Sequence, residues 1–190
     1  LMLANIKDIL IIVNEKDLLS YKNLLNDGSH LGISIKYSIQ KKPKGIAEAL
    51  IIGEKFINKD KVALILGDNI FYGHAFTDLL NKAKYNSGAT IFAYPINDPS
   101  RFGIVEIDRN TNRIKSLQEK PLKPKSNLAI TGLYFYDNDV SNYAKKIKPS
   151  IRKELEITDL NKIYFNKKKL NVITLTRGYS WLDTGTPDSL

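Results

Sequence analysis

The chain has 190 residues, enough for a hydrophobic core, and its 43% apolar and 26% charged residues are ordinary for a globular protein. It contains no run of about 18 apolar residues, which excludes a membrane-spanning helix. The net charge of +9 raises the question of nucleic acid, but the lysines are scattered and no aromatic residues alternate with them, so we expect no such partner.

The sequence contains no cysteine, which removes disulfides, thiol nucleophiles and Cys-ligated metals and fits a cytoplasmic protein. Residues 1–5 have no basic lead and therefore predict no secretory signal. They look like the last turn of a helix that begins before Leu1.

Strands and helices alternate along the first half of the sequence. Apolar or alternating runs predict strands, and capping residues with helical spacing predict helices between them. The predicted strands cover residues 8–13, 33–39, 62–66 and 89–94, and the helices cover 14–28, 46–53 and 75–84. This order indicates an α/β fold with a mixed, mainly parallel sheet flanked by helices. The continuous apolar runs at 8–13 and 62–66 predict strands buried on both faces.

The pattern changes after residue 100. Strands at 103–108 and 113–118 flank a strong turn signal at 109–112 and predict a small antiparallel hairpin. A strand at 130–136, helices near 139–148 and 156–166, and a strand at 170–176 follow. No repeat, low-complexity stretch or linker occurs, so residues 1–190 predict a single domain.

Two aspartates are candidate metal ligands. Asp68 follows a predicted strand, at the end where open α/β sheets bind ligands, and a carboxylate there could hold Mg²⁺. A helix cap is the alternative role for Asp68. Asp183 lies between Trp181 and Thr184, and could complete a magnesium–triphosphate site if the two carboxylates converge. An ordinary turn residue is its alternative.

Other polar residues suit the binding of a sugar phosphate or a nucleotide. Glu119 could accept hydrogen bonds from sugar hydroxyls, while Lys120 could meet a phosphate as a point charge, or the two could form a surface ion pair. Arg152 offers a fork for phosphate oxygens. Gln40 could read the edge of a nucleobase near Gly45, although a simple turn explains both.

Several common site motifs are absent from the sequence. It contains no Gly-x-Gly-x-x-Gly, no Walker A loop and no Gly-x-Ser-x-Gly elbow. His30 and His74 lack metal-ligand spacing.

Six stretches, in this order, resemble the glucose-1-phosphate thymidylyltransferases of deoxysugar synthesis, which belong to the sugar nucleotidyltransferases. The most specific is Leu-Gly-Asp-Asn-Ile-Phe-Tyr-Gly-His at residues 66–74. The others are Arg-Phe-Gly-Ile-Val-Glu at 101–106, Glu-Lys-Pro at 119–121 with Pro-Lys-Ser at 124–126, Thr-Gly-Leu-Tyr-Phe-Tyr-Asp at 131–137, Glu-Leu-Glu-Ile-Thr-Asp at 154–159 and Trp-Leu-Asp-Thr-Gly at 181–185.

The resemblance implies a Rossmann-like fold, dTTP and glucose 1-phosphate as substrates, Mg²⁺ as cofactor and a homotetramer, with dTDP-glucose and pyrophosphate as products. It implies roles for ten residues: Asp68 and Asp183 hold the metal, Gln40, Gly45 and Asp68 bind the nucleotide, Asn69, Gly103, Glu119 and Ile130 bind the sugar, and Lys120 and Arg152 lie near the sugar phosphate.

Two parts of the family pattern are missing. The family has a Gly-Gly-x-Gly-Thr-Arg loop and a following Lys that cradle the triphosphate, and neither occurs here. The closing C-terminal helices of the family also have no counterpart after Leu190. The resemblance therefore implies a chain that is incomplete at both ends, and we expect these 190 residues alone to be inactive and poorly soluble. Two alternatives stay open: a truncated regulatory relative that binds a sugar nucleotide without turnover, and the same chemistry with another base or sugar.

Overall fold

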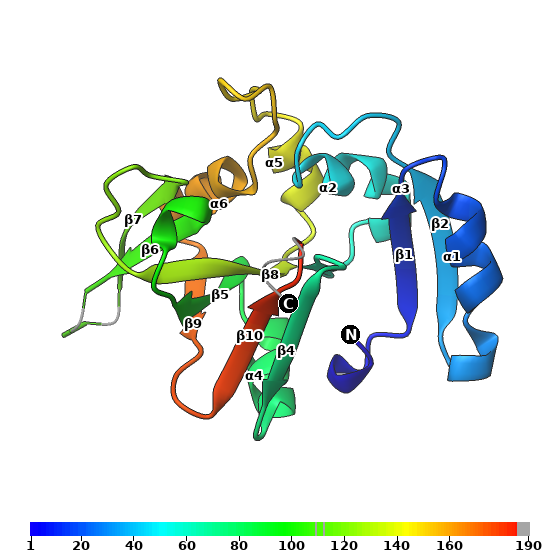
Figure 1. The fold of residues 1–190 in the computed structure, drawn as a ribbon, viewed down its shortest axis with the longest axis horizontal. Coiled ribbons are helices and arrows are strands. Elements are labelled where there is room, and N and C mark those ends of the chain that lie inside the picture. The colour runs from blue at the N-terminus through cyan, green and yellow to red at the C-terminus, as the bar shows by residue number, and fades with distance from the viewer. Residues whose placement is uncertain (109, 112, 186–190) are drawn as a thin grey trace. The chain divides into compact units, whose positions relative to one another are not determined.

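The structure, a computed structural model, describes residues 1–108, 110–111 and 113–185 (Figure 1). These residues form two compact units, and each unit combines two separate segments of the chain. The first unit comprises Leu1–Asp60 and Asn138–Ile157, and the second comprises Lys61–Asp137 and the segment that begins at Thr158. Among the described residues, no helix has the length and apolar character needed to cross a membrane. That the whole chain is one domain stays a prediction.

The first unit is built on a parallel strand pair. β1 (Asp8–Val13) runs beside β2 (Ser34–Ile39), and α1 (Leu18–Leu25) packs next to β2 (Figure 1). The Tyr37 hydroxyl of β2 donates a hydrogen bond to the main-chain oxygen of Asn26, 2.7 Å away, which ties the end of α1 to the strand. The other helices of this unit are η1 (Met2–Ala4), η2 (Ser29–Leu31), α2 (Glu48–Ile52), α3 (Glu54–Ile57) and α5 (Val140–Ala144).

The second unit contains a six-stranded sheet with β8 at its centre. The order is β7-β6-β8-β5-β9, and β3 also pairs with β8. The strands are β3 (Val62–Ile65), β5 (Ala89–Pro95), β6 (Gly103–Ile107), β7 (Ile114–Glu119), β8 (Leu128–Tyr136) and β9 (Leu170–Thr174). Nearly all of β8 is buried, because strands lie on both of its edges and side chains cover both of its faces. The core of this unit therefore lies along β5 and β8.

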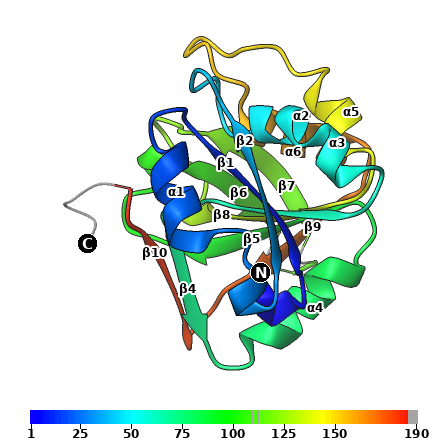
Figure 2. The same cartoon turned by 90° about the vertical axis from the view of Figure 1, so that its right-hand side faces the viewer.

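A separate two-stranded ladder contains Asn69 and Asp183, two of the predicted site residues. β4 (Asn69–Gly73) pairs antiparallel with β10 (Tyr179–Asp183), although more than half the chain separates them in sequence. Figures 1 and 2 show the two strands side by side in both views. The helices of this unit are η3 (Pro99–Arg101), α4 (Phe76–Tyr85) and α6 (Ile157–Asn166).

The α/β class and the mixed sheet are confirmed, but the expected predominance of parallel strands is wrong for the described residues. Only β1–β2 and β5–β9 are parallel, whereas the other five pairings are antiparallel. The reason is topological: β8 returns antiparallel between β5 and β6, and strand-helix alternation alone does not reveal such a return. The predicted strand list also lacked β4, whose polar and apolar residues do not form a recognisable run.

The apolar runs of β1 and β3 predicted full burial on both faces, and this expectation is also wrong for the described residues. Both strands are mostly half-buried. Within the described residues β1 has β2 as its single strand partner, and β3 has β8 as its single partner, so neither lies inside a sheet. The hairpin at 103–119 is confirmed, since the Asp108 N–H donates to the oxygen of Arg113 at 2.8 Å. Arg109 and Asn112 of its predicted turn lie outside the described residues.

Candidate active site

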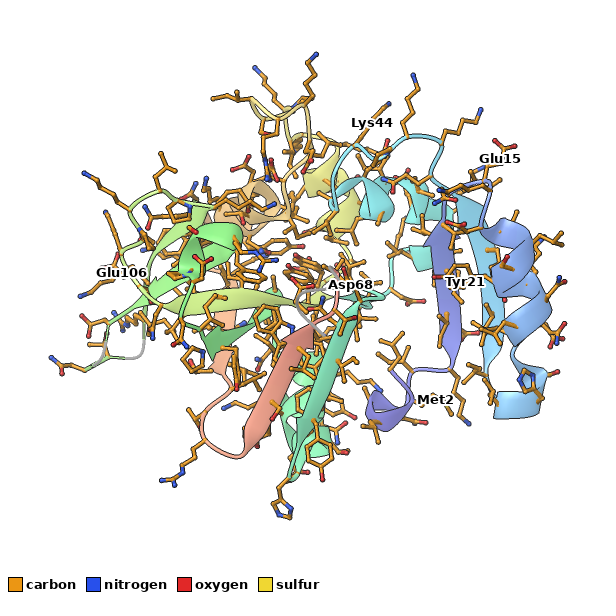
Figure 3. All side chains as sticks on the ribbon, in the orientation of Figure 1. Met2, Glu15, Tyr21, Lys44, Asp68 and Glu106 are labelled. Carbon is orange, nitrogen blue, oxygen red and sulfur yellow. The ribbon has the colours of Figure 1, made fainter. Side chains whose placement is uncertain are left out.

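Asp68 and Asp183 are brought together by the β4–β10 ladder. Asn69, next to Asp68, lies directly opposite Asp183 in the register of the two strands. The main-chain N–H and the hydroxyl of Thr184 both donate to the main-chain oxygen of Asp68, at 2.8 and 2.9 Å. Figure 3 shows Asp68 at the end of this strand pair. The convergence that the sequence could only suggest is therefore present in the fold.

Gly185 marks the place where the two carboxylates meet. A Cβ atom at this glycine would lie 2.9 Å from Oδ2 of Asp68 and 3.2 Å from Oδ1 of Asp183. Two carboxylate oxygens thus border one exposed point that only a residue without a side chain leaves open. This arrangement fits a hard divalent cation such as Mg²⁺, which takes one or two carboxylates and fills its other positions with water and phosphate oxygens.

No third acidic or histidine side chain joins this pair within the described residues. A metal held here would therefore need substrate or water oxygens as further ligands, as Mg²⁺ does when it accompanies nucleoside phosphates.

Three hydrogen bonds orient the side chain of Asn69. Its Oδ1 accepts hydrogen bonds from the main-chain N–H of Gly132 at 2.9 Å and from the indole Nε1 of Trp181 at 2.6 Å. Its Nδ2 donates to Oδ1 of Asp68 at 2.8 Å. A side-chain amide has two N–H donors, and one of those of Asn69 makes this bond to Asp68. The predicted sugar contact of Asn69 stays a prediction.

The predicted sugar residues Gly103 and Glu119 face each other across the β6–β7 hairpin. A Cβ atom on Gly103 would lie 2.9 Å from the hydroxyl of Thr158 and 3.5 Å from Oε2 of Glu119. The same hydroxyl donates a short hydrogen bond to Glu119 Oε2. The absence of a side chain at position 103 therefore lets the Thr158 hydroxyl approach the hairpin and orient the Glu119 carboxylate.

Sequence reasoning did not assign Thr158 to this cluster. The residue lies in one of the six family-like stretches, and it is fully buried near the start of α6. A buried hydroxyl needs a partner, and Glu119 supplies it. The sequence alone could not predict this contact, because strand β8 and other elements separate Glu119 from Thr158 along the chain.

Lys120 and Ile130 lie at the border of this cluster. Lys120 is exposed, adopts a positive φ of 39° and donates its main-chain N–H to the oxygen of Phe102 at 3.0 Å. This bond closes the end of the hairpin next to Gly103. Ile130 is buried, and its Cδ1 would lie 3.7 Å from a Cβ at Gly103. The phosphate contact of Lys120 and the sugar contact of Ile130 stay predictions.

Glu119 also influences a buried phenol. Burial raises the pKa of Tyr134 well above its ordinary value, and the negative charge of Glu119 raises it further. Tyr134 therefore stays protonated at physiological pH and adds no charge to the cluster.

The first unit carries the predicted residues Gln40, Gly45 and Arg152. The Gln40 amide donates from Nε2 to Oε2 of Glu48 at 2.6 Å. Gly45 has a φ of 99°, and a Cβ there would lie 2.6 Å from the main-chain nitrogen of Leu155. The glycine is therefore already required by the close approach of the chain's own backbone. Whether the same loop also approaches a nucleobase stays a prediction.

Arg152 is bound to a carboxylate of its own unit. Its Nη2 lies 2.8 Å from Oε2 of Glu156 and its Nε lies 3.2 Å from Oε1, a two-point contact. Glu156 is buried, and its Oε1 also accepts a hydrogen bond from the hydroxyl of Ser150 at 2.6 Å. The guanidinium is oriented by Glu156, and a phosphate would share or displace that contact.

The relatives of this chain are identified by its match to a known protein family. The nucleotidyl transferase family matches residues 1–190. The chain belongs to the nucleotidyl transferase family. The resemblance noted in the sequence is thereby confirmed at the level of the family, together with the fold class.

Relatives in this nucleotidyl transferase family include glucose-1-phosphate thymidylyltransferases. The chain is 54% identical over its whole length to the Neisseria meningitidis enzyme and 49% identical to that of Mycobacterium tuberculosis. It spans 66% of the length of each.

Solved structures of similar proteins share the fold of this chain. A Bacillus anthracis protein assigned as a glucose-1-phosphate thymidylyltransferase, crystallised with sucrose, is 37% identical, with a TM-score of 0.86 over 98% of this chain and 74% of its own. A UDP-glucose pyrophosphorylase in complex with UDP-glucose has a TM-score of 0.82 over 99% of this chain and 79% of its own. Because the two are 22% identical, this second likeness concerns the fold alone.

Proposed function

We propose that the intact protein containing this chain transfers the thymidylyl group of dTTP to glucose 1-phosphate and forms dTDP-glucose and pyrophosphate. The observation that carries the proposal is the meeting of the Asp68 and Asp183 carboxylates at Gly185. The choice of substrates is supported by a glucose-1-phosphate thymidylyltransferase that is 54% identical over the whole chain.

The reaction needs positioning and charge neutralisation more than a protein nucleophile. A phosphate oxygen of glucose 1-phosphate forms a bond to the α-phosphorus of dTTP, while the bond from that phosphorus to the bridging oxygen breaks and pyrophosphate leaves with the electron pair. When bound, Mg²⁺ neutralises charge on the phosphate oxygens. Asp68 and Asp183 would hold this ion.

The hairpin residues suit the sugar phosphate. Glu119, oriented by the Thr158 hydroxyl that Gly103 admits, would accept hydrogen bonds from sugar hydroxyls. The exposed ammonium group of Lys120, next along the chain, would neutralise charge on the phosphate. The proposal also includes Gln40 and Gly45 as nucleobase contacts and Arg152 as a phosphate contact. A homo-oligomer is proposed on the resemblance alone, and a location in the cytoplasm on the absence of cysteine from the sequence.

The test measures pyrophosphate release by the intact protein with dTTP, glucose 1-phosphate and Mg²⁺. Asp68→Asn and Asp183→Asn should each lower kcat at least about 100-fold, because each removes a charged ligand at the reacting phosphates. Asp78→Asn, an exposed acid on α4, is the matched control and should leave the rate unchanged. Full activity in the Asp183→Asn protein would refute the site, and a preference for UTP or for another hexose 1-phosphate would correct the substrate.

A further inference from the structure

Asn69 can adopt only one orientation of its side-chain amide. Its Oδ1 faces two donors, the Gly132 N–H and the Trp181 indole N–H, neither of which can accept a hydrogen bond. A flipped amide would place its NH₂ group against both donors and lose both bonds. The Nδ2 group is consequently directed at Oδ1 of Asp68.

Trp181 is itself held firmly. Its side chain is buried, and its ring makes edge contacts with Phe102 at 5.2 Å and with Tyr94 at 6.1 Å between centroids. It packs in one core cluster with Ile104 and Ala129. The indole N–H therefore points at Asn69 from a fixed position in β10, two residues before Asp183.

The Asp68 carboxylate lies in an exposed turn, where packing does not restrain it. The bond from Asn69 occupies Oδ1, so Oδ2 is the oxygen that borders the point at Gly185 shared with Asp183. Gly132 allows this arrangement, since a Cβ there would lie 2.5 Å from Oδ1 of Asn69.

From this geometry we propose that Trp181 is a positioning residue for the metal site: its indole N–H orients the Asn69 amide, which in turn presents Oδ2 of Asp68 to a divalent cation. The proposal rests on the proposed function, because it assumes that Asp68 and Asp183 bind the ion. Groups that orient a metal ligand typically change metal affinity or activity by about 10–100-fold.

The first experiment measures Mn²⁺ affinity of the intact protein by electron paramagnetic resonance. Trp181→Phe keeps an aromatic ring but removes the N–H, and should weaken Mn²⁺ binding by about tenfold or more. Tyr94→Phe is the matched control, because it changes a ring neighbour of Trp181 and leaves the indole N–H in place. It should change the affinity by less than about twofold on the same scale.

A second measurement detects the response of the wild-type protein directly. The indole N–H resonance of Trp181, assigned by its loss in Trp181→Phe or by labelling, should shift when Mg²⁺ is added to the wild-type protein, and should not shift in Asp68→Asn.

The outcomes separate the two proposals. Mn²⁺ binding that is lost in Asp68→Asn but kept within twofold in Trp181→Phe, or an indole resonance insensitive to Mg²⁺, would overturn the positioning role and leave the proposed function standing. Mn²⁺ binding unchanged in both Asp68→Asn and Asp183→Asn would overturn the metal site, and with it both proposals.

Discussion

At the scale of single residues, glycines without side-chain chemistry determine where the functional groups can lie. Gly185 leaves open the point between the two carboxylates, Gly103 admits the Thr158 hydroxyl that binds Glu119, and Gly132 admits the Asn69 amide. In each case the missing Cβ would contact a polar side-chain atom. The site is therefore shaped by what these positions lack.

Gly185→Ala tests this reading. The added Cβ would lie 2.9 Å from Asp68 Oδ2, so it should push the carboxylates apart and weaken Mn²⁺ binding by about tenfold, as loss of ligand placement does. Gly67→Ala is the control, since a Cβ there meets nothing within 4 Å and also adjoins Asp68. Calorimetric titration of both variants gives the comparison, and equal affinities would contradict the assignment of this point as the ion's place.

At the scale of elements, two antiparallel pairs position the site. The β4–β10 ladder joins the two aspartates, and the β6–β7 hairpin places Gly103 opposite Glu119. The turn of the hairpin depends on Asp108, whose carboxylate accepts hydrogen bonds from the N–H groups of Asn110 and Thr111 and lies 2.9 Å from the Lys115 ammonium. A polar turn far from the cluster thus supports the strand that carries Glu119.

The hairpin should loosen in acid. The hydrogen bond from Lys115 and the N–H bond of Thr111 hold the pKa of Asp108 well below its ordinary value of about 3.9. A lowered carboxylate pKa stabilises the fold above the ordinary value, and this contribution is lost as the pH falls through the depressed value. Hydrogen exchange of the β7 amides should be faster in Asp108→Asn than in wild type at pH 6.

The difference between Asp108→Asn and wild type should shrink progressively below about pH 4, where the ordinary carboxylate begins to protonate. Asp78→Asn, on an exposed helix face, serves as the control and should match wild type throughout. A difference that persists undiminished at the most acidic pH would show that the turn does not depend on the Asp108 charge.

At the scale of the molecule, each compact unit is assembled from chain segments that are distant in sequence. In the first unit, the junction between the segments includes backbone hydrogen bonds. The Leu155 N–H donates to the oxygen of Lys44 at 2.6 Å, and the Ala47 N–H donates to the oxygen of Leu155 at 3.2 Å. Gly45 lies between these two contacts, and its positive φ and lack of Cβ let the segments approach.

Gly45→Ala should therefore destabilise the protein more than a change of backbone preference alone. Gly32→Ala is the matched control, because Gly32 also has a positive φ, of 70°, but a Cβ there would meet nothing within 4 Å. Both variants should lose roughly 1–2 kcal/mol of unfolding free energy through left-handed strain. Gly45→Ala should lose a further 1–3 kcal/mol or so from the clash with Leu155. Equal losses in urea unfolding would contradict the junction.

Patterns along the chain were sufficient to predict the α/β class, the hairpin, the aspartate that follows β3, and the family. Periodicity and turn residues act between near neighbours, so such features are readable along the chain. The folded chain was needed to see that β8 returns antiparallel, that Asp183 meets Asp68, that Thr158 binds Glu119 and that Trp181 reaches Asn69. These pairs depend on strand register and on packing between distant segments, which no local pattern encodes.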